Sequence, residues 1–257
     1  SFASFAGPLV ATLFAMKGNW RFVFIVASAV AMSCALAAYL VLSVLEKKKQ
    51  ISYQTSKAQG ISAIFSVFKI EKFAFYMVVA CLVEISVASI SFWIPTFLIE
   101  NLYFSKNFAN IIFTVISLIR SLMPFVALAI FRAINKRDIA MMRVTFSIAA
   151  VMFAGLLIVS NRWLSLILLI LALMAMSCCS ALLWSIYIPG LGKTGKVSSV
   201  NGVLDCTGYI AAAVTNMLFA SVMSSIGWSA VFVLWSLIGV IGVIATLFVK
   251  EIKKEAA

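Results

Sequence analysis

The sequence contains no histidine, which excludes imidazole proton relays, Ser–His catalysis and metal sites built on histidine. Its five cysteines all lie within apolar runs, and no two form a CxxC pair, so neither a disulfide framework nor a zinc site is indicated. They are Cys34, Cys81, Cys178, Cys179 and Cys206. No nucleophile–base arrangement is visible either. We therefore expect a protein that is not an enzyme, with no metal and no cofactor.

Charge is also scarce. Only 11% of the 257 residues are charged, about half the fraction found in soluble domains, whereas 64% are hydrophobic. The mean hydropathy is +1.14. The alternating segments of about ten residues that mark a β-barrel are missing. These features predict an all-α polytopic membrane protein.

Long charge-poor runs predict about eight transmembrane helices, because about 20 apolar residues cross a bilayer as a helix. The runs are 2–16, 20–43, 73–99, 106–131, 139–160, 163–187, 198–225 and 227–249. Residues 60–72 are amphipathic, which favours a helix in the membrane interface. Because the chain starts at Ser1 within an apolar run, without an initiating Met, we expect a fragment of a longer membrane protein.

Basic residues are unevenly divided between alternate loops. Fifteen of the 20 Lys and Arg residues fall in the loop at 44–72, in the two later loops on the same side and at the C-terminus. Four fall on the other side, and Arg120 lies within a span. The positive-inside rule then places the 15, and the C-terminus, in the cytoplasm of a multi-pass plasma (inner) membrane protein. This distribution explains the net charge of +12 without a nucleic-acid partner.

An internal repeat connects the two ends of the chain. Gly18–Phe24 (GNWRFVF) and Gly227–Phe232 (GWSAVF) each follow a Leu-Phe-Ala triplet and precede an apolar span that ends in Lys and Glu. The repeat predicts two parallel six-helix halves. We assign 1–45 to the last two helices of the first half, 46–72 to a cytoplasmic central loop and 73–257 to the second half.

The Gly-x-Trp-Arg-x-x-Phe element at Gly18–Phe24, the basic central loop and the six later helices resemble the C-terminal two-thirds of a major facilitator superfamily transporter. The Phe92–Leu98 run (FWIPTFL) and the Gly208-Tyr209 pair are similar to the organophosphate–anion exchangers of that superfamily. The resemblance implies a major facilitator-type helical bundle that carries out secondary transport by alternating access, with helices seven, eight, ten and eleven lining a central cavity.

Three charges lie within spans, where each costs a few kcal/mol and so calls for a reason. At 1.5 Å per residue, Glu84 is roughly 16 Å from the cytoplasmic start of its span, and Arg120 is roughly 21 Å from the outer start of its own span. The two could therefore meet near the midplane. Asp205 is about 10 Å from the cytoplasmic end of its own span. Each charge is a candidate for binding substrate or a coupling ion. The alternative for each is a structural ion pair.

Polar residues on the same helices extend the candidate site. Ser91 shares a face with Glu84, and Ser117 lies one turn from Arg120. Asn201, Asp205 and Tyr209 follow each other at intervals of four residues. Trp184 lies near the end of the expected helix at 163–187, which would be the tenth of the twelve helices in the two halves. The predicted binding residues are Glu84, Arg120, Asp205, Ser91, Ser117, Asn201, Tyr209 and Trp184.

The favoured hypothesis is secondary transport of a small anionic organic solute held by Arg120, with Glu84 binding a coupling proton. One alternative is a proton-coupled exporter of cationic or amphipathic compounds, and another is a membrane sensor that transports nothing. The expected partners are a small-molecule substrate, the coupling ion, membrane lipid and the missing N-terminal helices of the same chain.

Overall fold

The computed structural model describes residues 20–48, 65–134 and 137–248, and these ranges are helical with no β-strand. Seven of their helices are long and apolar enough to span a bilayer, which confirms the predicted all-α membrane fold. The long helices are α2 (Trp20–Lys47), α4 (Phe73–Glu100), α5 (Lys106–Ala133), α6 (Asp138–Gly155), α7 (Arg162–Leu182), α9 (Val197–Ser225) and α10 (Trp228–Leu247).

Some expected segments differ from the structure. The first expected span, 2–16, lies outside the described residues. The interfacial helix expected over 60–72 lies partly outside the described residues: from residue 65 on, residues 65–67 are helical and residues 68–72 form turns. Lys72 has a left-handed backbone (φ 61°), which breaks the helical path just before α4. The span expected to reach residue 160 already ends at Gly155.

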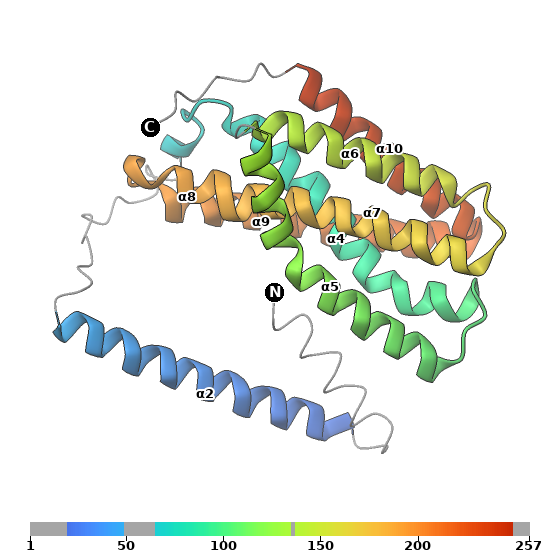
Figure 1. Ribbon diagram of the computed structural model, residues 1–257, viewed down its shortest axis with the longest axis horizontal. Coiled ribbons are helices and arrows are strands. Elements are labelled where there is room, and N and C mark those ends of the chain that lie inside the picture. Colours follow the sequence, from blue (N-terminus) through green and yellow to red (C-terminus); the bar gives the residue numbers. More distant parts are fainter. Residues whose placement is uncertain (1–19, 49–64, 135–136, 249–257) are drawn as a thin grey trace.

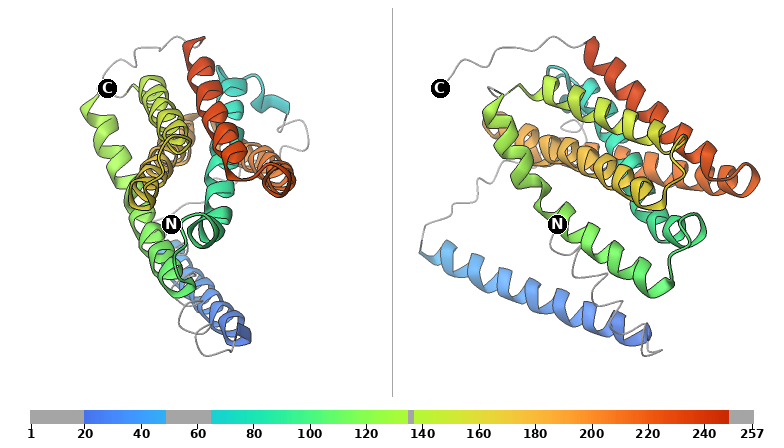
Figure 2. Two further views of the ribbon diagram at one scale, coloured as in Figure 1. Left: turned by 90° about the vertical axis from the view of Figure 1, so that its right-hand side faces the viewer. Right: turned by 45° about the vertical axis from the view of Figure 1, so that its right-hand side comes forward.

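Six helices, α4, α5, α6, α7, α9 and α10, pack into one bundle (Figure 1). The most extensive pairs are α6 with α10, α4 with α9, α6 with α7 and α5 with α7. In contrast, α2 lies to one side of the bundle and its span buries no residue against the other described helices (Figures 1 and 2). Of the six, α7 and α4 are the most buried, so they form the centre of the bundle.

Glycines bring α6 and α10 close together. A Cβ atom at Gly242 would lie 2.3 Å from Cδ1 of Phe146, and one at Gly239 would lie 2.8 Å from Cβ of Ala150. Small residues allow this approach, which increases van der Waals contact between membrane helices. At one end of the same pair, Arg143 on α6 donates from Nη2 to the carbonyl of Thr246 (2.9 Å).

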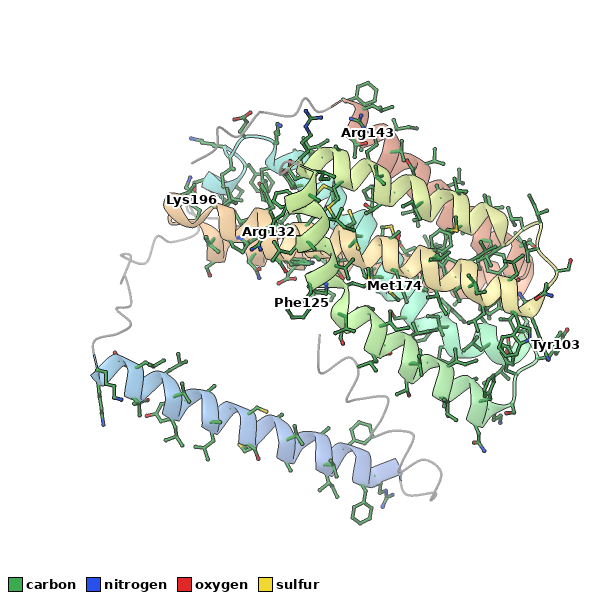
Figure 3. All side chains as sticks on the ribbon, in the orientation of Figure 1. Tyr103, Phe125, Arg132, Arg143, Met174 and Lys196 are labelled. Carbon is green, nitrogen blue, oxygen red and sulfur yellow. The ribbon has the colours of Figure 1, made fainter. Side chains whose placement is uncertain are left out.

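Helix ends and bends follow local chemistry. The side chain of Ser105 caps α5 by accepting from the backbone N–H of Phe108, and Asn161 caps α7 in the same way. Pro124 lies inside α5, where it removes a backbone hydrogen bond. The helix bends at this position, next to the labelled Phe125 (Figure 3).

The interhelical links alternate between the two ends of the bundle. Lys196, just before α9, lies at one end, and Tyr103, in the α4–α5 link, lies at the other (Figure 3). The N-terminus of α4 is at the same end as Lys196, because Nζ of Lys196 donates to the carbonyl of Ser66 (3.1 Å). Residues near the middle of α4 and α5, such as Glu84 and Arg120, are therefore remote from both ends.

Candidate functional site

A cavity of 390 Å³, open on one side, lies among α4, α5, α7 and α9. It is lined by Glu84, Val87, Arg120, Ser121, Ser180, Trp184, Asp205 and Tyr209. A smaller cavity of 140 Å³ shares Val87, Arg120, Ser180 and Trp184 with it. All three charges that the sequence places within spans therefore face one space. Its volume is within the range of about 300–1,000 Å³ usual for small-molecule pockets.

Arg120 reaches this cavity from α5 and is held by α4. Its Nη1 donates a hydrogen bond of 2.7 Å to Oγ of Ser91. That hydroxyl in turn donates to the carbonyl of Val87 one turn earlier (2.6 Å), which fixes the direction of its lone pairs. Among the described residues, Nε and Nη2 of Arg120 have no acceptor. The guanidinium is thus oriented on one side while its other N–H groups remain available.

Glu84 is a half-buried residue on α4 that lies against both α7 and α9. The indole Nε1 of Trp184 donates to its Oε1 at 3.3 Å. On the α9 side, Gly208 leaves room for the Glu84 side chain, since a Cβ atom there would lie 2.8 Å from Cγ of Glu84. The carboxylate is therefore placed by one donor and one small residue, and its Oε2 has no donor among the described residues.

Asp205 belongs to α9, one turn before Gly208. Its Oδ2 accepts a hydrogen bond from Nδ2 of Asn201 at 2.9 Å, the i, i+4 neighbour on the same face. Like Glu84, it is half-buried and lines the cavity. Its electrostatic interaction with Glu84 is repulsive, and the interaction of Glu84 with Arg120 is attractive. The two carboxylates and the guanidinium thus form one electrostatic group.

The three charges do not form direct ion pairs with each other. Glu84 and Arg120 each use a neutral hydrogen-bonding partner instead, Trp184 and Ser91 respectively. Charges within a membrane protein are usually paired or face a water-filled space. The unpaired arrangement therefore favours a solvated cavity that receives a charged ligand. Within the described ranges, no group of three Cys, Asp or Glu residues is placed to hold a metal ion.

A π-helical turn follows α7 at Leu183–Tyr187 (η1) and places Trp184 over the cavity. Such turns insert an extra residue into a helix and are frequent at functional sites. The helix then continues as α8 (Ile188–Gly190), so that Arg162–Gly190 is one span. The sequence predicts the span and Trp184 but gives no sign of the π turn.

The structure brings five of the eight predicted site residues to the cavity wall: Glu84, Arg120, Asp205, Trp184 and Tyr209. Ser91 and Asn201 do not line the cavity, but they form hydrogen bonds with Arg120 and Asp205, which do. Ser117 is buried on α5 and lines neither of these two cavities. Sequence reasoning missed Ser180 and Ser121, although Ser180 lies one turn before Trp184 and could have been found by helical periodicity.

Other cavities lie at the ends of the bundle. One of them, of 630 Å³, is formed by the α4–α5 and α6–α7 links with the start of α10, and includes Arg162. At the opposite end, a cavity of 190 Å³ is lined partly by Tyr76, Asp138 and Tyr187. The hydroxyl of Tyr76 donates to Asp138, and its ring stacks on Tyr187. We place the candidate site in the central cavity because three charged side chains from three different spans, Glu84, Arg120 and Asp205, face it together.

Comparison with known families gives a match over most of the chain. The family model described as Major Facilitator Superfamily matches residues 1–213, which is most of the chain and includes α2 to α7 and the first half of α9. No curated protein matches the chain significantly. The matched region contains every residue of the candidate site.

Proposed function

The chain belongs to the major facilitator superfamily, which is a family of membrane transporters and not of enzymes, and from that premise we propose that it moves a small anionic organic solute by secondary active transport. The mechanism proposed is alternating access between two six-helix halves around a central site, with the described six-helix bundle as one half. The proton is the proposed coupling ion. The proposed location is the plasma (inner) membrane, with the C-terminus in the cytoplasm.

The observation that carries this proposal is the state of Arg120. It is a permanent cation within a membrane span, it faces a cavity of 390 Å³, and no carboxylate neutralises it directly. A guanidinium with free N–H groups binds carboxylate and phosphate groups through two parallel hydrogen bonds. An anionic group on the solute would supply the acceptors that the protein does not.

Glu84 supports the proton-coupled form of the proposal. It lines the same cavity as Arg120 and interacts electrostatically with it, so gain or loss of a proton by Glu84 would change the field at the anion site. Transport coupled to a proton needs such a link between a titrating group and the substrate.

The test is stabilisation of the purified full chain against thermal unfolding by organic acids and sugar phosphates. A ligand at about 100 times its Kd adds about 2.7 kcal/mol to the free energy of unfolding, which is readily detected. We expect at least one anion to stabilise the protein and Arg120→Gln to abolish the effect. Arg132→Gln, which removes an exposed arginine from the end of the same helix, is the matched control. Stabilisation that survives Arg120→Gln would contradict the proposal.

A second candidate function is proton-coupled export of cationic or amphipathic compounds. It is favoured by the presence of two carboxylates, Glu84 and Asp205, and two aromatic residues, Trp184 and Tyr209, around the same cavity. Aromatic faces and carboxylates both attract organic cations. Stabilisation by cations alone, lost in Glu84→Gln and retained in Arg120→Gln, would favour this function over the first.

A further inference from the structure

The charges that line the central cavity do not match a purely anionic solute. Its described wall carries one cation, Arg120, and two carboxylates, Glu84 and Asp205, so its formal charge is −1 when all three are ionised. An anion bound to Arg120 would lie in the same cavity as two groups that repel it. A cation alone would offer no acceptor to the free N–H groups of the guanidinium.

The hydrogen-bonding atoms of the wall that have no partner are also divided, into donors on Arg120 and acceptors on Glu84 and Asp205. Among the described residues, Nε and Nη2 of Arg120 have no acceptor, and together they carry three N–H bonds. Oε2 of Glu84 and Oδ1 of Asp205 have no donor. The cavity therefore offers a donor face on α5 and an acceptor face on α4 and α9.

The acceptor face depends on the contact between Glu84 and Gly208. Gly208 follows Asp205 by three residues on α9, so the two positions are neighbours on the helix surface. Because Gly208 has no side chain, Glu84 packs directly on α9 at this point, with its Cγ 2.8 Å from where a Cβ atom would be. The two carboxylates are thereby brought to the same part of the cavity wall.

We infer that the transported solute is a zwitterion, which carries a carboxylate, phosphate or phosphonate for Arg120 and an ammonium group for Glu84 and Asp205. This inference rests on the proposed function, because Arg120 still binds an anionic group of the solute, and it adds an ammonium group to that solute. An ammonium group has three donors, enough to satisfy the free oxygens of both carboxylates. Trp184 and Tyr209 complete the wall and provide aromatic faces for the cationic end.

The experiment compares matched probes on the purified full chain by thermal unfolding and calorimetry. One set is 4-aminobutyrate, butyrate and butylamine, and the other is 2-aminoethylphosphonate, ethylphosphonate and ethylamine. In at least one set, we expect the zwitterion to bind about tenfold or more tightly than its anion, the effect of one charge-assisted hydrogen bond. Glu84→Gln and Asp205→Asn should reduce this preference at least severalfold, whereas Glu100→Gln, at the exposed end of α4, should retain it.

The outcomes separate the inference from the proposed function. If anions bind as tightly as zwitterions and Arg120→Gln abolishes both, the inference is wrong and the anion transporter stands. If cations alone bind and Arg120→Gln has no effect, both are wrong. No preference for the zwitterion in either set, in a protein that unfolds cooperatively, also overturns the inference. Should Glu84→Gln fail to fold, Asp205→Asn provides the same comparison from α9.

Discussion

Gly208 on α9 and Glu84 on α4 are in direct contact at the wall of the central cavity, and a Cβ atom on the glycine would lie 2.8 Å from Cγ of the glutamate. The same Cβ atom would be 3.3 Å from Cβ of Glu84. The two helices therefore meet at the residue that carries the intramembrane negative charge of α4. Because Gly208 has no side chain, the Glu84 side chain can occupy this position against α9.

Replacement of Gly208 by Ala should displace the Glu84 carboxylate, because the Cγ of Glu84 is too near the backbone to move away freely. Overpacking of this kind costs about 1–3 kcal/mol of stability. We expect a lower melting temperature and at least severalfold weaker stabilisation by substrate. Gly202→Ala is the control, since a Cβ atom at Gly202 on the same helix would meet nothing within 4 Å. Equal behaviour of the two variants would show that the contact is unimportant.

The Ser91 hydroxyl should orient Arg120 for the anion. Ser91→Ala removes the acceptor of the 2.7 Å hydrogen bond from Nη1, while the charge of the guanidinium remains. Hydrogen bonds to charged groups contribute about 1.5–3 kcal/mol, so we expect roughly a tenfold rise in the Kd for an anion, measured by calorimetry. Ser86→Ala on the same helix is matched to it, because the Ser86 hydroxyl donates only to its own helix, at Leu82. A Kd unchanged by Ser91→Ala would remove the positioning role.

Packing of α6 against α10 should depend on Gly242. A Cβ atom there would lie 2.3 Å from the Phe146 ring, closer than any relaxed contact, so Gly242→Ala should lower the melting temperature of the protein in detergent. The double variant Gly242→Ala/Phe146→Leu should recover part of the loss, because the smaller side chain leaves space for the methyl group. Additive losses in the double variant would mean that the two sites are not coupled.

Much of the fold could be predicted because a bilayer allows few solutions. Long apolar runs must be helices whose backbone groups are satisfied internally, and charges within them are easily recognised. Glu84, Arg120 and Asp205 were found in this way, and all three line one cavity in the structure. Helical periodicity also placed Asn201 beside Asp205, where it donates a hydrogen bond.

The interhelical partners could not be predicted, because periodicity identifies a face of a helix but not the neighbour that covers it. The spacing of Ser91 places it on the same face as Glu84, yet its partner is Arg120, 29 residues away on α5. Nothing in the sequence indicated that Gly208 would pack on Glu84. The left-handed Lys72 and the π turn at Leu183–Tyr187 likewise have no recognisable signature in the sequence.

The orientation of the bundle can be tested by cysteine labelling. The positive-inside rule predicts that the link before α9 is cytoplasmic and the α6–α7 link is external. In a background without the exposed Cys34 and Cys206, an impermeant maleimide should label Ser160→Cys in intact cells and Thr194→Cys only after permeabilisation. Both positions are exposed in the structure, so access to solvent does not bias the result. The reverse pattern would invert the topology.

Proton coupling should depend on Glu84. Glu84→Gln keeps the size and the acceptor for Trp184 Nε1, but its amide cannot bind and release a proton. We expect a pH gradient to drive no uptake in proteoliposomes, because a variant that carries no proton cannot use the gradient. Exchange of labelled for unlabelled substrate needs no net proton movement, so it should persist at saturating substrate concentration. The charged groups that face Glu84 across the cavity, Arg120 and Asp205, are unchanged in this variant.

Glu100→Gln, which removes an exposed carboxylate from the end of the same helix, should leave both activities unaltered. Gradient-driven uptake that survives in Glu84→Gln would assign the coupling to another group, and Asp205, the second carboxylate of the cavity, would be the next residue to replace.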